Sequence, residues 1–340
     1  MTEIQNGIRD TGPPRETPNS NTPASAKDYL TIARFDHSTK HVFIVPGIIL
    51  AYSLRHPPLE HAIISILTGF CSAILVASAN YVINEWLDRQ FDAFHPLKSQ
   101  RTAVRRTLSP LIVYAEYFFF AGLGLILAFL VGELFFLASI AFVLSGLIYN
   151  VNPIRTKDKA YIDVLSESIN NPIRLVLGWT MIDAETLPPS SLVFSYWMGG
   201  AFLMTAKRLS EYRDIASEQG VEVLHLYRRS FRSYTAETLM VSCLLYAILS
   251  AFFIAVFLIK YRIEYVLAFP FIATLFALYF WLSLMRESIA QKPERLFRSR
   301  RLMLVVGLTV AVLVVTTFID VPVLSFLSAP YFIDVQAVGQ

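Results

Sequence analysis

The sequence predicts an all-α, polytopic membrane protein with nine transmembrane helices. Hydrophobic residues make up 55% of the 340 residues, charged residues only 16%, and the mean hydropathy is +0.51. Soluble domains average about 25% charged residues, so this composition is typical of a chain that lies largely in lipid. Nine apolar runs, most of them near the ~20 residues that a helix needs to cross the hydrocarbon core, alternate with charged connections.

The apolar runs define the expected helices in chain order. The first is short for a full crossing and can recruit the residues before it. The expected spans are 41–54, 61–84, 110–131, 133–151, 161–182, 191–212, 236–259, 263–285 and 302–320.

The segments around these runs divide the chain into three parts. Residues 1–28 are rich in Thr, Pro, Asn and Ser and have no signal-peptide pattern, so we expect a disordered cytoplasmic tail. Residues 29–320 form the expected intramembrane domain. Residues 321–340 form an expected C-terminal tail outside the cytoplasm.

The distribution of Lys and Arg predicts the orientation. Of the 29 basic residues, 25 lie within the first 40 residues or in and beside the connections after the second, fourth, sixth and eighth runs. Cytoplasmic connections carry an excess of Lys and Arg. We therefore expect the N-terminus inside and the C-terminus outside a bacterial-type inner membrane or its equivalent.

Two long connections suggest an internal repeat. Residues 85–109 and 213–235 both lie on the expected cytoplasmic side, four runs apart, and each follows a polar helix end. This layout predicts two four-helix halves around a central cavity, with the ninth helix as an addition.

The second run ends in the polar stretch N-E-W-L-D-R-Q-F-D. Residues four apart on a helix differ by only about 40° in direction, so Asn84, Asp88 and Asp92 share one face. Glu85 lies beside them. Such oxygen ligands suit Mg²⁺ that also binds substrate phosphate oxygens. A solvated helix end with ordinary surface charge is the alternative.

Basic residues accompany both polar helix ends. Lys98 and Arg101 follow the acidic stretch, where cations suit outer phosphate oxygens. At the end of the sixth run, Lys207 and Glu211 share a face and Arg208 lies beside them. One interpretation is a phosphate clamp whose Lys207 is held by Glu211. The other is a pair of cations reaching the membrane edge.

The fifth run carries a polar stripe inside the expected membrane span. Ionisable groups there usually face the bundle interior or a wet cavity. Arg174 is the deepest of them and is a candidate substrate ligand, unless it forms a structural salt bridge. Pro172 would kink the helix. The stripe consists of Asp163, Glu167, Asn170 and Arg174.

A basic segment precedes the first run. Arg34, His37 and Lys40 can lie along one side of an entering helix. Lys40 is then a candidate substrate ligand. Basic flanks also serve as membrane-surface anchors, which is the alternative.

The motif N-E-x-x-D-x-x-x-D, followed by H-P-x-K-x-x-R, resembles the UbiA-type intramembrane prenyltransferase superfamily. The resemblance extends over residues 30–320. It implies a nine-helix transferase in which Asn84, Asp88 and Asp92 bind Mg²⁺ and, through it, a prenyl pyrophosphate. Glu85 stands where most members have Asp.

The second motif is similar to one branch of that superfamily, which makes polyprenylphosphoryl-5-phosphoribose. Most members have Asp residues at this place, whereas this chain has K-R-x-x-E over residues 207–211. Tyr149 and Lys40 also look similar to that branch, as in decaprenylphosphoryl-5-phosphoribose synthase. Leu203 stands where the branch often has Tyr.

These observations give a function with two alternatives. We expect Mg²⁺-dependent transfer of 5-phosphoribose from phosphoribosyl pyrophosphate (PRPP) to a polyprenyl phosphate, with release of pyrophosphate. One alternative is prenyl transfer from a prenyl pyrophosphate to an aromatic or polar acceptor. The other is a transporter whose path the polar stripe would line. We expect no nucleic-acid partner, and the sequence leaves open a homo-oligomer.

Overall fold

The computed structural model describes residues 22–58, 60, 62–285 and 299–327, and all of its named elements in these ranges are helical. The expected tails, 1–28 and 321–340, lie largely outside the described residues. Six described helices are long and apolar enough to cross a membrane, so the protein is an integral membrane protein. They are α3 (Ala62–Asp92), α5 (Pro110–Val131), α6 (Glu133–Asn150), α11 (Ala236–Tyr261), η5 with α12 (Ile263–Ser283) and α14 (Arg300–Phe318).

The three other expected spans are also helical but are not simple apolar crossings. The first combines the 3₁₀ helix η1 (Phe35–Ile44) with α2 (Val45–Arg55). The fifth is divided into α7 (Ile162–Ser168) and α8 (Asn170–Thr180). The sixth, α9 (Ser190–Gln219), is long but has a polar second half. The all-α membrane class is confirmed, and nine crossings stay a prediction.

The break in the fifth span lies at Ile169, between α7 and α8. Pro172 follows three residues later and has no backbone N–H to donate to the preceding turn. The predicted kink is therefore confirmed, and it separates the lower and upper parts of the polar stripe.

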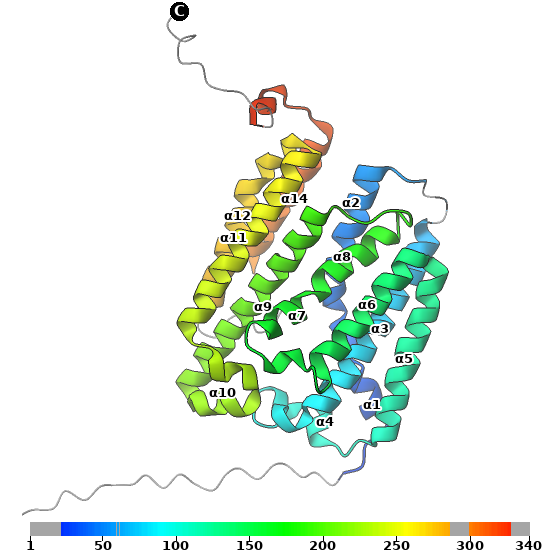
Figure 1. Cartoon of the computed structure of the whole chain (residues 1–340), viewed down its shortest axis with the longest axis vertical. Coiled ribbons are helices and arrows are strands. Elements are labelled where there is room, and N and C mark those ends of the chain that lie inside the picture. The colour runs from blue at the N-terminus through cyan, green and yellow to red at the C-terminus, as the bar shows by residue number, and fades with distance from the viewer. Residues whose placement is uncertain (1–21, 59, 61, 286–298, 328–340) are drawn as a thin grey trace, which may run out of the picture.

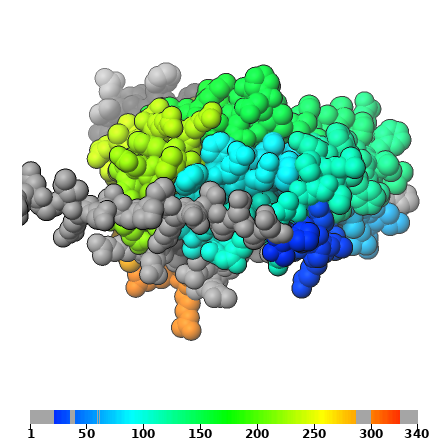
Figure 2. Space-filling view, turned by 90° about the horizontal axis from the view of Figure 1, so that it is seen from below, coloured from blue at the N-terminus to red at the C-terminus, as the bar shows by residue number. Residues whose placement is uncertain are grey.

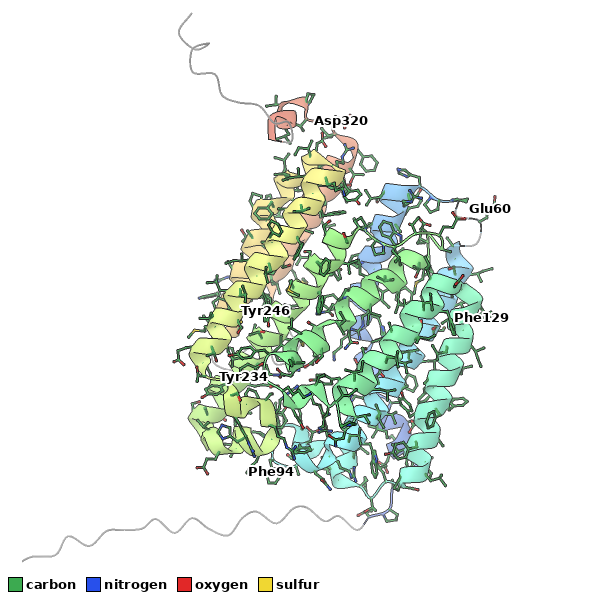
Figure 3. All side chains as sticks on the ribbon, in the orientation of Figure 1. Glu60, Phe94, Phe129, Tyr234, Tyr246 and Asp320 are labelled. Carbon is green, nitrogen blue, oxygen red and sulfur yellow. The ribbon has the colours of Figure 1, made fainter. Side chains whose placement is uncertain are left out.

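Short helices gather at one end of the molecule. Figure 1 shows α1, α4 and α10 at its lower end, where α3 also ends. Phe94 lies at this end, whereas Glu60 and Asp320 lie at the opposite end (Figure 3). The short elements at the lower end are α1 (Ala26–Ile32), η2 (Lys98–Gln100), α4 (Thr102–Arg105), η3 (Thr156–Asp158), α10 (Val221–Tyr227) and η4 (Arg229–Ser233). The short helix η7 (Pro322–Leu327) lies at the opposite end, next to Asp320.

The helices pack in two groups that agree with the expected halves. In the first, Val76 of α3, Ala128 of α5 and Phe142 of α6 share one buried core. In the second, Phe202 of α9 and Cys243 of α11 share another, to which α12 contributes. Helix α14 packs on α12 and η5 as the added helix.

Helices α2 and α8 join the two groups through a close backbone approach. A Cβ atom on Gly47 would lie 2.2 Å from the Leu175 carbonyl oxygen, and one on Gly178 would lie 2.0 Å from that of Ile44. Larger side chains at these two positions would push the helices apart. The pair of glycines thus holds η1 and α2 against the helix that carries Arg174.

Candidate active site

A cavity of about 460 Å³ lies between the two groups of helices and opens among the polar helix ends. Most residues selected from the sequence line it, although they come from five helices and from the connection after α3. The acidic and basic motifs therefore share one hollow. The selected residues that line it are Lys40, Asn84, Asp88, Asp92, Lys98, Arg101, Tyr149, Arg174, Lys207, Arg208 and Glu211.

The acidic motif is on one face of α3 because that helix continues without a break to Asp92. The amide nitrogen of Asn84 donates to Asp88 Oδ2 at 3.3 Å and to Asn150 Oδ1 at 2.6 Å. Asn150 is the last residue of α6. The end of α6 thus fixes the first turn of the acidic motif.

Two cations after α6 hold the Asp88 carboxylate. Arg155 Nη2 donates to Asp88 Oδ1 at 3.0 Å, and Lys157 Nζ pairs with the same oxygen and also donates to Asn150 Oδ1 at 2.6 Å. Burial lowers the pKa of the Lys157 ammonium to about 8, and Asp88 opposes that decrease. The sequence analysis used these cations only for orientation. The signal that could have identified them is their position directly after α6, the helix whose end faces the acidic motif.

Asp92, Lys98 and Arg101 form a second group at the mouth of the cavity. Arg101 pairs with Asp92. Lys98 contacts the Tyr227 hydroxyl and lies 3.9 Å from Glu211 Oε1. Burial lowers the pKa of the Lys98 ammonium to about 7, with Glu211 opposing the decrease.

These contacts join the two long connections. His95 packs edge-on against Tyr227, with 4.4 Å between ring centroids. In Figure 2, which views the end where α4 and α10 lie, the cyan segment around residue 100 and the yellow-green segment of α10 lie side by side. The connections predicted to lie on one side of the membrane therefore meet over the cavity.

His95 is a further residue that was not selected from the sequence. It is 4% exposed and lines the cavity. Its Nδ1 accepts the backbone N–H groups of Leu97 and Lys98 at 3.0 and 3.2 Å, so the proton of the neutral ring is on Nε2. That buried Nε2 has no hydrogen-bond partner among the described residues.

Glu85 lies outside this arrangement. It is buried, but it does not line the cavity. Its Oε2 accepts Arg34 Nη2 at 2.5 Å, and its Oε1 accepts the Ala103 N–H at 3.3 Å. The structure therefore does not bring Glu85 together with the three other expected magnesium ligands.

The second polar motif is organised around Arg208. Its guanidinium is 1% exposed and lies 3.4 Å from Asp163 Oδ2, 2.5 Å from Glu167 Oε2 and 3.3 Å from Glu211 Oε2. The expected ion pair between Lys207 and Glu211 is wrong, because Glu211 pairs with Arg208 and Lys98 instead.

Lys207 differs from its neighbour. Its side chain lines the cavity, and among the described residues it has no hydrogen-bond or ion-pair partner. The ammonium is therefore available to a ligand.

The polar stripe of the fifth span divides between the ion pairs around Arg208 and the wall of the cavity. Asp163 and Glu167 pair with Arg208, and Tyr149 donates to Glu167 Oε2 at 2.7 Å while accepting from Arg228. The alternative of a salt bridge from Arg174 to Asp163 or Glu167 is wrong. Asp163 also accepts hydrogen bonds from Ser230 and from Tyr234, whose hydroxyl lies 2.6 Å from Oδ1.

The charge of the cavity wall is strongly positive. Ten Lys and Arg side chains line it, against five Asp and Glu side chains. A surplus of cations in a recess concentrates anionic ligands, and polyphosphates suit it best. The lining cations are Arg34, Lys40, Lys98, Arg101, Arg155, Lys157, Arg174, Lys207, Arg208 and Arg228.

A helical bundle within the membrane, with a charged cavity behind an aspartate motif, defines the class of intramembrane transferases. The chain belongs to the UbiA prenyltransferase family, whose sequence profile matches residues 42–305. The resemblance inferred from the motifs is thereby confirmed, and the transporter alternative loses its support.

Individual relatives agree with this assignment. Nodulation protein NoeC from Azorhizobium caulinodans is 31% identical over 206 residues, which are 60% of this chain and 62% of that protein. The chain thus matches somewhat less than two thirds of that relative's length.

Two solved structures share the fold. A UbiA homolog from Archaeoglobus fulgidus bound to GPP and Mg²⁺ is 19% identical, with a TM-score of 0.63 over 86% of this chain and 100% of that chain. A digeranylgeranylglyceryl phosphate synthase structure is 14% identical, with a TM-score of 0.58 over 86% and 98%.

Proposed function

We propose that this protein transfers 5-phosphoribose from PRPP to a polyprenyl phosphate and releases pyrophosphate. The observation that carries the proposal is the pairing at the second polar motif. Glu211 of this motif and two carboxylates of α7, Asp163 and Glu167, are all paired with Arg208. Lys207 is left facing the cavity. Guanidinium groups that neutralise the carboxylates favour a phosphate-binding site here over a second magnesium site.

The acidic motif fits one Mg²⁺. Asp88, Asp92 and Asn84 offer hard oxygen ligands from one helix face, and all three line the cavity. The described residues contain no group of three or more His, Cys, Asp or Glu side chains that could hold a metal alone. A site with two carboxylates suits Mg²⁺ that completes its coordination with phosphate oxygens. When bound, the ion would neutralise charge on the departing pyrophosphate.

The side chains of the chain itself then bind and position the two substrates. Lys98 and Arg101 lie beside Asp92 and suit the outer oxygens of the pyrophosphate. Lys207 suits a further phosphate. Arg208 supports the site by holding Glu167 and Glu211 in place.

The transfer step needs positioning more than proton abstraction. An oxygen of the lipid phosphate attacks C1 of the ribose, the bond from C1 to the pyrophosphate oxygen breaks, and the electron pair leaves with pyrophosphate. The attacking oxygen is already ionised at neutral pH, so no general base is required. Holding the two substrates in line supplies much of the rate.

Prenyl transfer is the second candidate. It is favoured by the solved UbiA homolog that binds GPP and Mg²⁺. In that reaction the acidic motif would hold a prenyl pyrophosphate, and Lys98 and Arg101 would contact the same leaving group. The two candidates differ in what occupies the basic half of the cavity.

We place the active site on the cytoplasmic side, with the N-terminus inside and the C-terminus outside. The basic connections around α4 and α10 lie at one end, and the last described helices end at the other (Figure 1). Excess Lys and Arg favours the cytoplasm for the first end. Labelling single Cys substitutions at Ser99 and Asp320 with a membrane-impermeant reagent in intact cells tests this. Reaction at Ser99 and protection at Asp320 would reverse the assignment.

The function is tested by pyrophosphate release from PRPP in detergent with Mg²⁺. We expect release only after a polyprenyl phosphate is added, and none with Asp88→Asn. Release without any lipid phosphate, or undiminished release by the variant, would overturn the proposal.

A further inference from the structure

Arg174 is a buried cation that has no counter-ion among the described residues. Its side chain lies on α8, is 6% exposed and lines the cavity. Among the described residues, its polar contact is the Asn170 carbonyl oxygen, 3.3 Å from Nη1, and its guanidinium lies 4.9 Å from the centre of the Phe142 ring. Its buried Nε has no hydrogen-bond partner. Burying a guanidinium in this way is costly unless an anion compensates for it.

The carboxylates nearest in sequence do not supply that anion. Asp163 and Glu167 precede Arg174 in the same span, but both pair with Arg208 and Arg228. The break at Ile169 separates them from α8. Arg174 is therefore left for a ligand.

Helix η1 completes the surroundings of Arg174. The approach of Gly47 and Gly178 brings η1 and α2 against α8. Lys40 of η1 lines the cavity, lies 5.2 Å from the centre of the Tyr81 ring and pairs with no carboxylate among the described residues. Tyr81 packs against the buried core that includes Phe142, the ring over which Arg174 lies. Within the described part of the chain, the neighbouring His41 Nδ1 is also buried without a hydrogen-bond partner.

This group is distinct from the acidic motif. Asp88 pairs with Arg155 and Lys157, and Asp92 pairs with Arg101. Among the described residues, neither carboxylate pairs with Lys40 or Arg174. Among the described residues, Lys40, Arg174 and Lys207 are the lining cations that pair with no carboxylate.

We propose that Arg174 and Lys40 form a second anion subsite, which binds a phosphate monoester independently of Mg²⁺. The identity of that ester rests on the proposed function, which supplies two sources: the phosphate of the polyprenyl lipid and the 5-phosphate of the ribose. Both present a compact dianion that a guanidinium and an ammonium can bind together.

Binding to the purified full-length protein in EDTA tests the subsite and separates the two sources. Farnesyl phosphate and ribose 5-phosphate are the probes, measured by calorimetry against wild type, Arg174→Gln and the control Arg213→Gln. Arg213 is exposed and does not line the cavity. We expect Arg174→Gln to raise the Kd of one probe by roughly tenfold or more, because a charged hydrogen bond is lost, and Arg213→Gln to change neither.

The outcomes are distinct. Weakened farnesyl phosphate binding assigns the subsite to the lipid, and weakened ribose 5-phosphate binding assigns it to the sugar. If Arg174→Gln does not fold, Lys40→Gln replaces it with the same expectation. Unchanged Kd values for both probes overturn the subsite, as does binding that requires Mg²⁺. Because no turnover is measured, a failure of PRPP transfer would refute the proposed function without refuting the subsite.

Discussion

Arg208 Nη2 of α9 lies 2.5 Å from Glu167 Oε2 of α7, inside a bundle where Arg208 is only 1% exposed. The same guanidinium also reaches Asp163 and Glu211. These ion pairs connect Asp163, Glu167 and Glu211 to one guanidinium, so the second motif is a basic site. Arg208 and Lys207 are adjacent in sequence, but they differ in role. Arg208 forms buried ion pairs within the bundle, whereas Lys207 faces the cavity.

Replacing Arg208 should destabilise the protein. Arg208→Met removes the cation that buried Asp163 and Glu211 share, leaving Arg228 at 3.5 Å and Lys98 at 3.9 Å as their remaining partners. Breaking a buried pair in this way costs about 3–5 kcal/mol. Thermal unfolding in detergent measures the effect, with Lys207→Met as the adjacent control. A melting temperature lowered equally by both variants would show that Arg208 has no special structural role.

Lys207→Met should instead impair substrate binding. The ammonium has no partner to lose among the described residues, so the fold should be retained. Losing a charged contact to a phosphate should raise KM for PRPP about tenfold or more. Steady-state kinetics beside Lys159→Met, at an exposed position outside the cavity, measures this. A normal KM with a lowered melting temperature would assign Lys207 a structural role.

The acidic motif can be tested against its neighbour on the same helix end. Asp88→Asn removes a proposed magnesium ligand and should lower kcat at least about 10²-fold without unfolding the protein. Glu85→Gln should act mainly on stability, because the Glu85 carboxylate pairs with Arg34 and does not line the cavity. Activity measured over a range of Mg²⁺ concentrations separates the two. A stronger Mg²⁺ requirement in Glu85→Gln than in Asp88→Asn would reverse the roles.

Lys98 should make activity depend on pH. Burial lowers the pKa of its ammonium to about 7, so the group loses its charge as the pH rises above that value. The charged form binds phosphate oxygens, and kcat/KM should therefore fall as the pH is raised from 6.5 to 8.5. Lys98→Arg, which keeps its charge, should flatten this part of the profile. An unchanged slope in Lys98→Arg would exclude Lys98 as its source.

The sequence was sufficient for features set by periodicity and composition. The spacing of Asn84, Asp88 and Asp92 predicts one helix face, and α3 does continue through all three. Apolar run lengths located every long helix, and Pro172 predicted the break near Ile169.

Pairing between distant segments could not be predicted in the same way. Glu211 was expected to hold Lys207, but it pairs with Arg208, and Asp163 and Glu167 reach the same guanidinium from α7. Arg155 and Lys157 approach Asp88 from a connection more than sixty residues away. Many carboxylates compete for each cation, and only the packing of helices decides among them.

The most direct test of phosphoribosyl transfer supplies PRPP and a prenyl pyrophosphate to the same protein preparation. Purified protein in detergent with Mg²⁺ and a polyprenyl phosphate receives PRPP and geranyl pyrophosphate together with an aromatic acceptor, and lipid products are identified by mass spectrometry. We expect a polyprenyl phosphate that has gained one phosphoribosyl group, and no prenylated acceptor. A prenylated acceptor without any phosphoribosylated lipid would contradict the account.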